Sequence, residues 1–181
     1  LVGSEMCIRD RAIFLYPLNA LAEDQKTRFS KYIEVSGRNL HFATYNGNTP
    51  ENDQDDNYVV PLKHEINTRQ AIRETPPEIL VTNPTMLEYM LLRDKDRSVL
   101  IAARNLRWIV IDETHTFKGA AAAELALLLR RVLLAAGVSR DQVQFVTSSA
   151  TTGSGNDADL KKFIAGISGK QADQIEIISG K

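Results

Sequence analysis

The stretch that decides the fold reads Trp108-Ile109-Val110-Ile111-Asp112-Glu113-Thr114-His115. Its first half is a short apolar run without polar alternation, which is typical of a strand buried on both faces in a parallel sheet. Two carboxylates and an imidazole follow directly. Because open α/β sheets bind ligands beyond the carboxyl ends of their strands, this tip is a candidate catalytic site.

The acidic tip has two interpretations when it is considered alone. In P-loop NTPases, an aspartate at this place holds the Mg²⁺ that bridges the β- and γ-phosphates, and a neighbouring carboxylate can orient the attacking water. Acidic pairs also end strands simply as solvated turn residues. Other parts of the sequence are needed to distinguish the catalytic interpretation from the solvated turn.

Length and composition indicate one ordinary globular domain. The chain has 181 residues, 43% of them hydrophobic and 25% charged, with a formal net charge of −1. A near-neutral charge neither demands nor excludes nucleic acid, because a binding groove needs only a local basic stripe. The single cysteine excludes an internal disulfide framework, and no apolar run is long enough to span a bilayer. These features predict a cytoplasmic protein without membrane association.

The first eleven residues have neither strand nor helix periodicity, and no turn joins them to the rest of the chain. They resemble the peptide that results when sequencing-adapter sequence is translated. We therefore assign residues 1–11 to a non-native leader and residues 12–181 to the domain.

The rest of the sequence alternates between apolar runs and amphipathic segments. Strands are predicted over residues 13–16, 40–45, 79–82, 108–111, 142–147 and 175–178. Helices are predicted over residues 20–35, 62–75, 84–91, 120–136 and 160–167, the first of them capped by Asn19. Strands alternating with helices predict an α/β fold, a parallel sheet with helices on both faces.

Four motifs resemble those of superfamily-two DEAD/DEAH-box (DExH) helicases. Asp112-Glu113-Thr114-His115 looks like the Asp-Glu-x-His box, and Ser149-Ala150-Thr151 matches the Ser-Ala-Thr motif. Tyr16-Pro17-Leu18-Asn19-Ala20-Leu21-Ala22-Glu23-Asp24-Gln25 resembles motif Ia, and Val81-Thr82-Asn83-Pro84-Thr85-Met86-Leu87 resembles motif Ib. Their order is that of the family, and the resemblance implies a RecA-like first ATPase domain.

The resemblance also implies a role for each matching residue. Asp112 would bind Mg²⁺ through water, and Glu113 would orient the water that attacks ATP. His115, Ser149, Ala150 and Thr151 would couple the nucleotide site to strand movement. Four positions would contact the nucleic-acid backbone, without reading base sequence: Leu18, Asn19, Thr82 and Asn83.

Several of these residues have simpler interpretations. His115 could only cap the turn, and Ser149 and Thr151 could be ordinary loop hydroxyls. Asn19 could be a helix cap and also contact phosphate, because a capped helix N-terminus presents its NH groups to anions.

One family feature is missing from the sequence. A motor of this kind needs a Gly-x-x-x-x-Gly-Lys-Ser/Thr loop (Walker A) before motif Ia, and the chain contains none. We therefore expect a fragment of an ATP-dependent helicase, inactive alone, with a second RecA-like domain elsewhere in the parent chain. The residues after His115 resemble large bacterial Lhr-like helicases, which favours DNA over RNA. The alternatives are a non-catalytic nucleic-acid-binding module and a P-loop translocase subunit of a restriction system.

Overall fold

One sheet of five parallel strands forms the centre of the protein, in a computed structural model that describes residues 10–149 and 157–178. The strands are β1 (Arg11–Leu15), β2 (Phe42–Tyr45), β3 (Ile79–Thr82), β4 (Leu106–Ile111) and β5 (Gln144–Thr147). Their order across the sheet is β2-β3-β1-β4-β5. The α/β class and the parallel sheet predicted from the sequence are confirmed.

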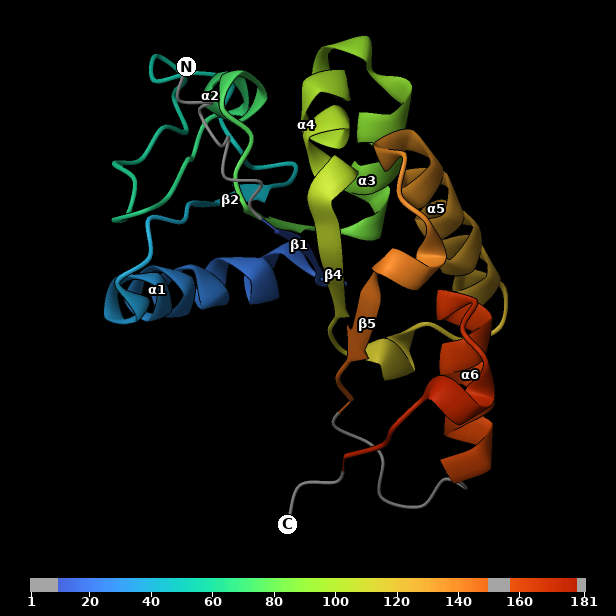
Figure 1. Cartoon of the computed structure of the whole chain (residues 1–181). Coiled ribbons are helices and arrows are strands. Elements are labelled where there is room, and N and C mark those ends of the chain that lie inside the picture. Colours follow the sequence, from blue (N-terminus) through green and yellow to red (C-terminus); the bar gives the residue numbers. More distant parts are fainter. Residues whose placement is uncertain (1–9, 150–156, 179–181) are drawn as a thin grey trace, which may run out of the picture.

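Helices lie on both faces of this sheet, as predicted (Figure 1). They are α1 (Asn19–Ser36), α2 (Arg69–Glu74), α3 (Pro84–Leu92), α4 (Arg97–Ala102), α5 (Ala120–Ala136) and α6 (Asp157–Ser168). In Figure 1, α1 lies to one side, and α3, α4, α5 and α6 lie to the other. Each of the two long helices ends at a glycine in the left-handed region, Gly37 and Gly137, where a side chain would be strained.

The strand order has a topological switch point between β1 and β4. We call it the reversal point, because the chain leaves these two neighbouring strands in opposite directions. The chain leaves β1 through α1 and goes toward β2 at one edge, whereas it leaves β4 through α5 and goes toward β5 at the other edge. Right-handed crossovers in opposite directions lie on opposite faces of a sheet. The carboxyl ends of β1 and β4 are therefore the place where open sheets of this kind bind ligands.

Two apolar clusters hold the layers together. The larger one joins the sheet to α3, α4, α5 and α6, and includes fully buried Ile109, Leu129 and Val132. The smaller one joins α1 to the opposite face, where the rings of Phe14 and Phe29 meet edge to face at 4.9 Å. Burial of these side chains is the main force that fixes the sheet between the helices.

The prediction that β4 is buried on both faces is wrong. Ile109 and Ile111 are completely buried, but Trp108 is 40% exposed on the opposite face. Val146, on the same face of neighbouring β5, is 41% exposed. An apolar run predicts a strand within a sheet. The pattern of the run does not show how far the helices cover each face of that sheet.

Other predicted elements also differ from the structure. Residues 175–178 form no strand; they follow a short 3₁₀ turn, Ala172–Gln174. The helix expected over residues 62–75 is limited to Arg69–Glu74. The short α4 was not predicted, because six residues show too little periodicity.

The beginning of β1 falls inside the segment that we assigned to a leader. Arg11 pairs with Leu106 of β4, and its guanidinium donates to the carbonyl oxygens of Pro76 and Pro77, to the former at 2.8 Å. The ordered sheet therefore starts one residue earlier than the predicted boundary. Across the described residues, no helix combines the length and apolar character needed to cross a membrane.

Candidate functional site

Asp112 lies at the reversal point of the sheet. Its backbone NH donates to Leu15 O at 2.9 Å, which extends the pairing of β4 with β1 by one residue. The Ser148 hydroxyl, at the end of β5, donates to Oδ1 of Asp112. Two strand ends thus fix the backbone and one oxygen of this carboxylate, so it is held in place before any ligand arrives.

Glu113 occupies a strained turn directly after Asp112. Its backbone is left-handed, with φ 51° and ψ 43°, a conformation uncommon for a residue with a Cβ. Thr114 ties the turn to the end of β5: its NH and its hydroxyl both donate to Ser148 O, each at 2.9 Å. Such strain persists only when the surrounding structure enforces it, and it is common at functional sites.

His115 joins the acidic tip to the end of β5. Its Nδ1 lies 3.1 Å from Oε2 of Glu113 and 3.4 Å from the Ser149 hydroxyl. The predicted catalytic and coupling residues Glu113, His115 and Ser149 therefore lie in one contact chain. Ala150 and Thr151 lie outside the described residues.

Tyr16 directly follows β1, at the same end of the sheet as Asp112. Burial raises the pKa of its phenol, and the negative charge of Asp112 raises it further, against a smaller opposite effect of Arg28. Its NH donates to Thr82 O at 3.0 Å, which ties the end of β1 to β3. The carboxylate of Asp112 and the phenol of Tyr16 are therefore electrostatically coupled.

The residues at the tip fit a magnesium ion. Carboxylate oxygens are the ligands that Mg²⁺ prefers, and the ion is usually held by one or two carboxylates, waters and substrate phosphates rather than by a full protein cage. Asp112 supplies one such carboxylate, and Glu113 follows it directly in the chain. No cluster of three or more acidic, His or Cys residues capable of binding a metal occurs in the described part of the chain.

The predicted nucleic-acid residues gather at the neighbouring strand ends. Leu18 is 63% exposed and is itself the N-cap of α1, without a side-chain cap. The prediction that Asn19 caps this helix is therefore wrong. Asn19 is the first helical residue, and its Oδ1 accepts a hydrogen bond from Nδ2 of Asn83 at 2.8 Å.

Asn83 and Thr82 hold motif Ib in place. Oδ1 of Asn83 caps α3 by accepting from Met86 N at 2.7 Å, while its Nδ2 group reaches Asn19. Thr82 is only 1% exposed, and its hydroxyl donates to Tyr45 O at 2.6 Å. The Thr82 side chain is thus engaged inside the protein, whereas Asn83 lies at the surface edge.

A third strand end was not singled out as a site in the sequence. The turn after β2 is built around Asn46, which is 1% exposed and whose Nδ2 group donates to Oε1 of Glu23 at 3.3 Å. Arg69 clamps the turn by donating to Thr49 O at 2.9 Å and to Asn46 O at 3.0 Å. The only sequence signal was an Asn-Gly-Asn-Thr-Pro run, typical of any turn.

The sequence and the fold are similar to those of known helicases. The DEAD/DEAH box helicase family matches residues 5–159. The chain is 33% identical over 129 residues to Druantia protein DruE of Escherichia coli (strain UMEA 4076-1), covering 66% of the chain and 7% of that protein. It is 32% identical over 142 residues to the uncharacterized ATP-dependent helicase YprA of Bacillus subtilis (strain 168). This match covers 78% of the chain and 17% of that protein.

Solved structures of helicases are also similar to this chain. The DUF1998 helicase MrfA bound to DNA and AMPPNP matches with a TM-score of 0.64 and 29% identity, covering 89% of this chain and 20% of that one. The Mycobacterium smegmatis helicase Lhr bound to ssDNA and AMP-PNP matches with a TM-score of 0.58 and 24% identity over 80% of this chain and 17% of that one, a likeness of fold.

The chain spans less than a fifth of the length of the two curated relatives described above. The family match nevertheless covers both the acidic tip and the three neighbouring strand ends. With a RecA-like parallel sheet, a carboxylate pair at its reversal point and a family match over most of its length, the chain belongs to the DEAD/DEAH box helicase family.

Proposed function

We propose that this chain is the first RecA-like part of an ATP-dependent helicase motor that moves on DNA. The observation that carries the proposal is the position of Asp112, fixed by Leu15 and Ser148 at the reversal point of the sheet. There it would bind Mg²⁺ through water, and the ion would neutralise charge on the β- and γ-phosphates of ATP. Glu113, on its strained turn, would orient the attacking water.

The coupling of ATP hydrolysis to movement on DNA would involve the residues at the end of β5. His115 contacts both Glu113 and Ser149, so a change at the carboxylate can reach the first residue of the Ser-Ala-Thr motif. A second RecA-like domain of the same parent protein would complete the nucleotide site.

Single-stranded DNA would bind across the ends of β1 and β3. Leu18 and Asn19 stand at the start of α1, and Asn83, directly after Thr82 at the end of β3, is the N-cap of α3, so two helix starts lie at the same edge of the sheet. Contacts of this kind are made to phosphates and do not read sequence. DNA is favoured over RNA because MrfA, a similar structure, is a helicase with bound DNA. We place the motor in the cytoplasm.

The test is a Glu113→Gln variant in a longer protein that carries this chain together with a phosphate loop. The amide keeps the size of the side chain but cannot accept a proton, so DNA-stimulated ATP hydrolysis should fall by about 10²- to 10⁴-fold while ATP binding persists. Glu124→Gln, an exposed glutamate on α5, is the matched control and should be unchanged. Hydrolysis at the unmodified rate in Glu113→Gln would remove Glu113 from the proposed role.

A further inference from the structure

A groove lies between α3, α4 and α5, on the side of the sheet opposite to α1 (Figure 1). Its volume is about 330 Å³, and its apolar lining includes Met90, Leu91 and Ile101. Its charged lining is Arg93, Asp94 and Arg97. We call it the basic groove, because two arginines and one aspartate leave it with a net positive charge. None of its residues belongs to the proposed nucleotide site or DNA edge, so the proposed function does not use it.

The composition around the basic groove is that of a protein interface. Ile101, in its wall, is 49% exposed, and Leu92 and Leu134, beside lining residues in the chain, are also exposed. Arg93 lies over the ring of Tyr89, with 5.0 Å between the guanidinium carbon and the ring centroid. Aromatic residues, Met and Arg are enriched at protein interfaces, whereas Lys and Glu are depleted. Apolar side chains that stay exposed beside arginines therefore indicate a site for another protein surface.

The two arginines of the basic groove have charge left for a partner. Arg131, on neighbouring α5, is already paired with Glu88 at 2.9 Å. By contrast, neither Arg93 nor Arg97 forms an ion pair with a carboxylate of residues 10–149 or 157–178. A guanidinium can bind a carboxylate through two parallel hydrogen bonds. An acidic protein surface is therefore the partner that these side chains fit.

The chain itself carries a surface of this chemistry. Residues 51–62 contain four carboxylates and no lysine or arginine, and we call them the acidic segment. Asp53 and Asp56 are exposed. Val59 and Val60 follow them and are exposed as well, Val60 by 80%. A segment that is both acidic and apolar at its surface is complementary to an apolar groove with free arginines.

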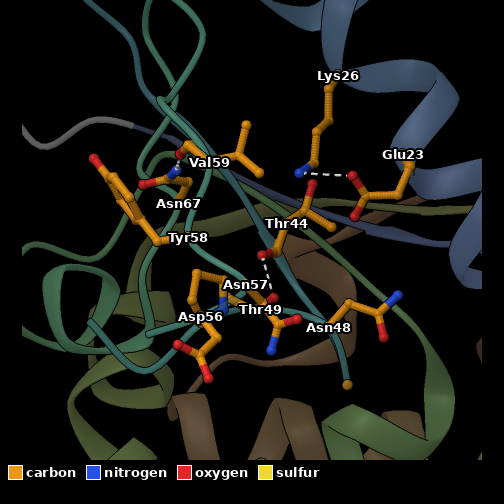
Figure 2. Close-up of a pocket in the computed structure, with 12 residues that line it drawn as sticks. Glu23, Lys26, Thr44, Asn48, Thr49, Asp56, Asn57, Tyr58, Val59 and Asn67 are labelled. Carbon is orange, nitrogen blue, oxygen red and sulfur yellow. Dashed lines mark hydrogen bonds and ion pairs between the residues drawn. The ribbon is translucent and has the colours of Figure 1, made fainter. Parts of the chain in front are cut away.

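The carboxylates of the acidic segment are not neutralised by α1. Figure 2 shows Asp56 and Lys26 of α1 around one cavity. The Nζ atom of Lys26 is bound instead by Glu23 at 2.7 Å and by Glu65 at 3.1 Å. In the part of the chain that the structure describes, Asp53 and Asp56 form no ion pair. These two carboxylates are therefore available to a second molecule.

The basic groove and the acidic segment lie at the same end of the molecule. Lys95, next to Asp94 of the groove, has its Nζ 3.9 Å from Glu51 at the start of the acidic segment. Arg73 of α2 joins the two regions as well, because it pairs with Glu51 and with Asp96. When complementary surfaces are neighbours on one molecule, a two-fold axis between them brings each surface opposite its complement on a second copy. Such an arrangement is closed and ends at a dimer.

From these observations we propose that two copies of the chain form a symmetric dimer, with the acidic segment of each copy in the basic groove of the other. The carboxylates of Asp53 and Asp56 would pair with the two arginines of the groove. Val59 and Val60 would cover the exposed side of Ile101. The dimer goes beyond the proposed function and does not depend on it, because no residue of the nucleotide site or of the DNA edge takes part.

Sedimentation velocity of the 181-residue chain tests the dimer. Over protein concentrations from about 1 to 200 µM, we expect a monomer–dimer equilibrium with a dissociation constant of about 10–100 µM, as for a small transient interface. Because salt screens exposed ion pairs, raising sodium chloride from about 0.05 to 0.5 M should weaken the dimer about five-fold or more. A chain that stays monomeric over this range would overturn the proposal.

Two charge-reversed variants give a sharper test. Arg93→Glu/Arg97→Glu makes the groove acidic, and Asp53→Lys/Asp56→Lys makes the segment basic. Each variant alone should dimerise about ten-fold more weakly or worse, because like charges then meet. An equal mixture of the two should form a heterodimer about as strong as the unmodified dimer, because both of its contacts again join opposite charges. Failure of the mixture to associate, or unchanged association of each variant alone, would contradict the dimer.

Substitutions of apolar side chains separate this surface from others. Val60→Ser should weaken the dimer about three- to ten-fold through lost apolar contact, whereas Val35→Ser, at an exposed valine of α1, should leave it unchanged. Trp108→Ser alters the partly exposed face of β4. Association that depends on Trp108 and not on Val60 would place the contact there and overturn the proposal. Circular dichroism checks that each variant folds; if a charge-reversed variant does not, the salt dependence and Val60→Ser decide.

Discussion

Nδ2 of Asn83 donates a hydrogen bond of 2.8 Å to Oδ1 of Asn19, and this bond joins the starts of two helices that belong to different motifs. The other end of the Asn83 amide caps α3 at Met86 N. One side chain thus stabilises a helix and sets the spacing of two strand ends. Substitutions at position 83 can separate these two effects.

Asn83→Asp should keep the cap but lose the donor to Asn19, whereas Asn83→Ala should lose both. We expect Asn83→Ala to lower the free energy of unfolding by about 1 kcal/mol, as for other caps, and Asn83→Asp to lower it less. Both should weaken binding to single-stranded DNA, the aspartate also through repulsion of phosphate. Urea unfolding and fluorescence anisotropy measure the two effects. Equal destabilisation by both substitutions would show that the cap is not the main contribution of Asn83.

Ser149→Ala and Thr151→Ala should uncouple unwinding from hydrolysis. Ser149 contacts His115, which in turn contacts Glu113, so its loss interrupts the contact chain without removing a carboxylate. In a longer protein with the phosphate loop, strand displacement should fall more than ATP hydrolysis. The two assays are run side by side on each variant, and a loss of equal size in both would contradict a coupling role.

The 181-residue chain alone should fold but should not hydrolyse ATP. Its core is of ordinary size, yet the sequence has no glycine-rich loop whose NH groups and lysine would hold a triphosphate. Positioning is the main source of catalysis in phosphoryl transfer, so Asp112 and Glu113 cannot act on an unanchored phosphate. ATP turnover with and without single-stranded DNA or RNA is compared with that of Asp112→Ala. Turnover above this background would show that the loop is not required.

Tyr45 should ionise only in strongly alkaline solution while the chain is folded. Burial, together with its 2.5 Å hydrogen bond to Asp96, raises the pKa of its phenol to about 12, although Arg73 opposes the shift. Because the folded pKa is raised, the stability that Tyr45 contributes is fully present below pH about 10 and is lost as the pH rises through about 12. Titration followed by near-ultraviolet absorbance should show one step near pH 12 that is absent in Tyr45→Phe.

Tyr45→Phe should also cost about 1–3 kcal/mol of unfolding free energy at neutral pH, because Asp96 is fully buried and loses one of its donors. Arg73 still donates to the same carboxylate oxygen at 2.8 Å, which limits the loss. Stability equal to that of the unmodified chain would show that Arg73 alone satisfies Asp96.

Local sequence predicted the elements whose evidence lies within a few residues. Residues 79–82 and 120–136 form a strand and a helix with the predicted limits, because each has a clear apolar pattern ended by a turn residue or a glycine. The acidic tip after β4 was predicted from the same kind of local evidence. Elements without a strong local pattern, such as α4 and residues 175–178, were predicted wrongly or not at all.

By itself, then, the sequence determined that strands and helices alternate, that the sheet is parallel, and that carboxylates and hydroxyls follow the strands. Only the tertiary structure decided which strands are neighbours. Asn19 meets Asn83, and Glu23 meets Asn46, because the order β2-β3-β1-β4-β5 brings together segments that are far apart in the chain. It likewise decided that Trp108 is partly exposed and that Ile101 lines a groove. The physical reason is that burial and hydrogen-bond partners depend on neighbours in space, whereas periodicity records only neighbours along the chain.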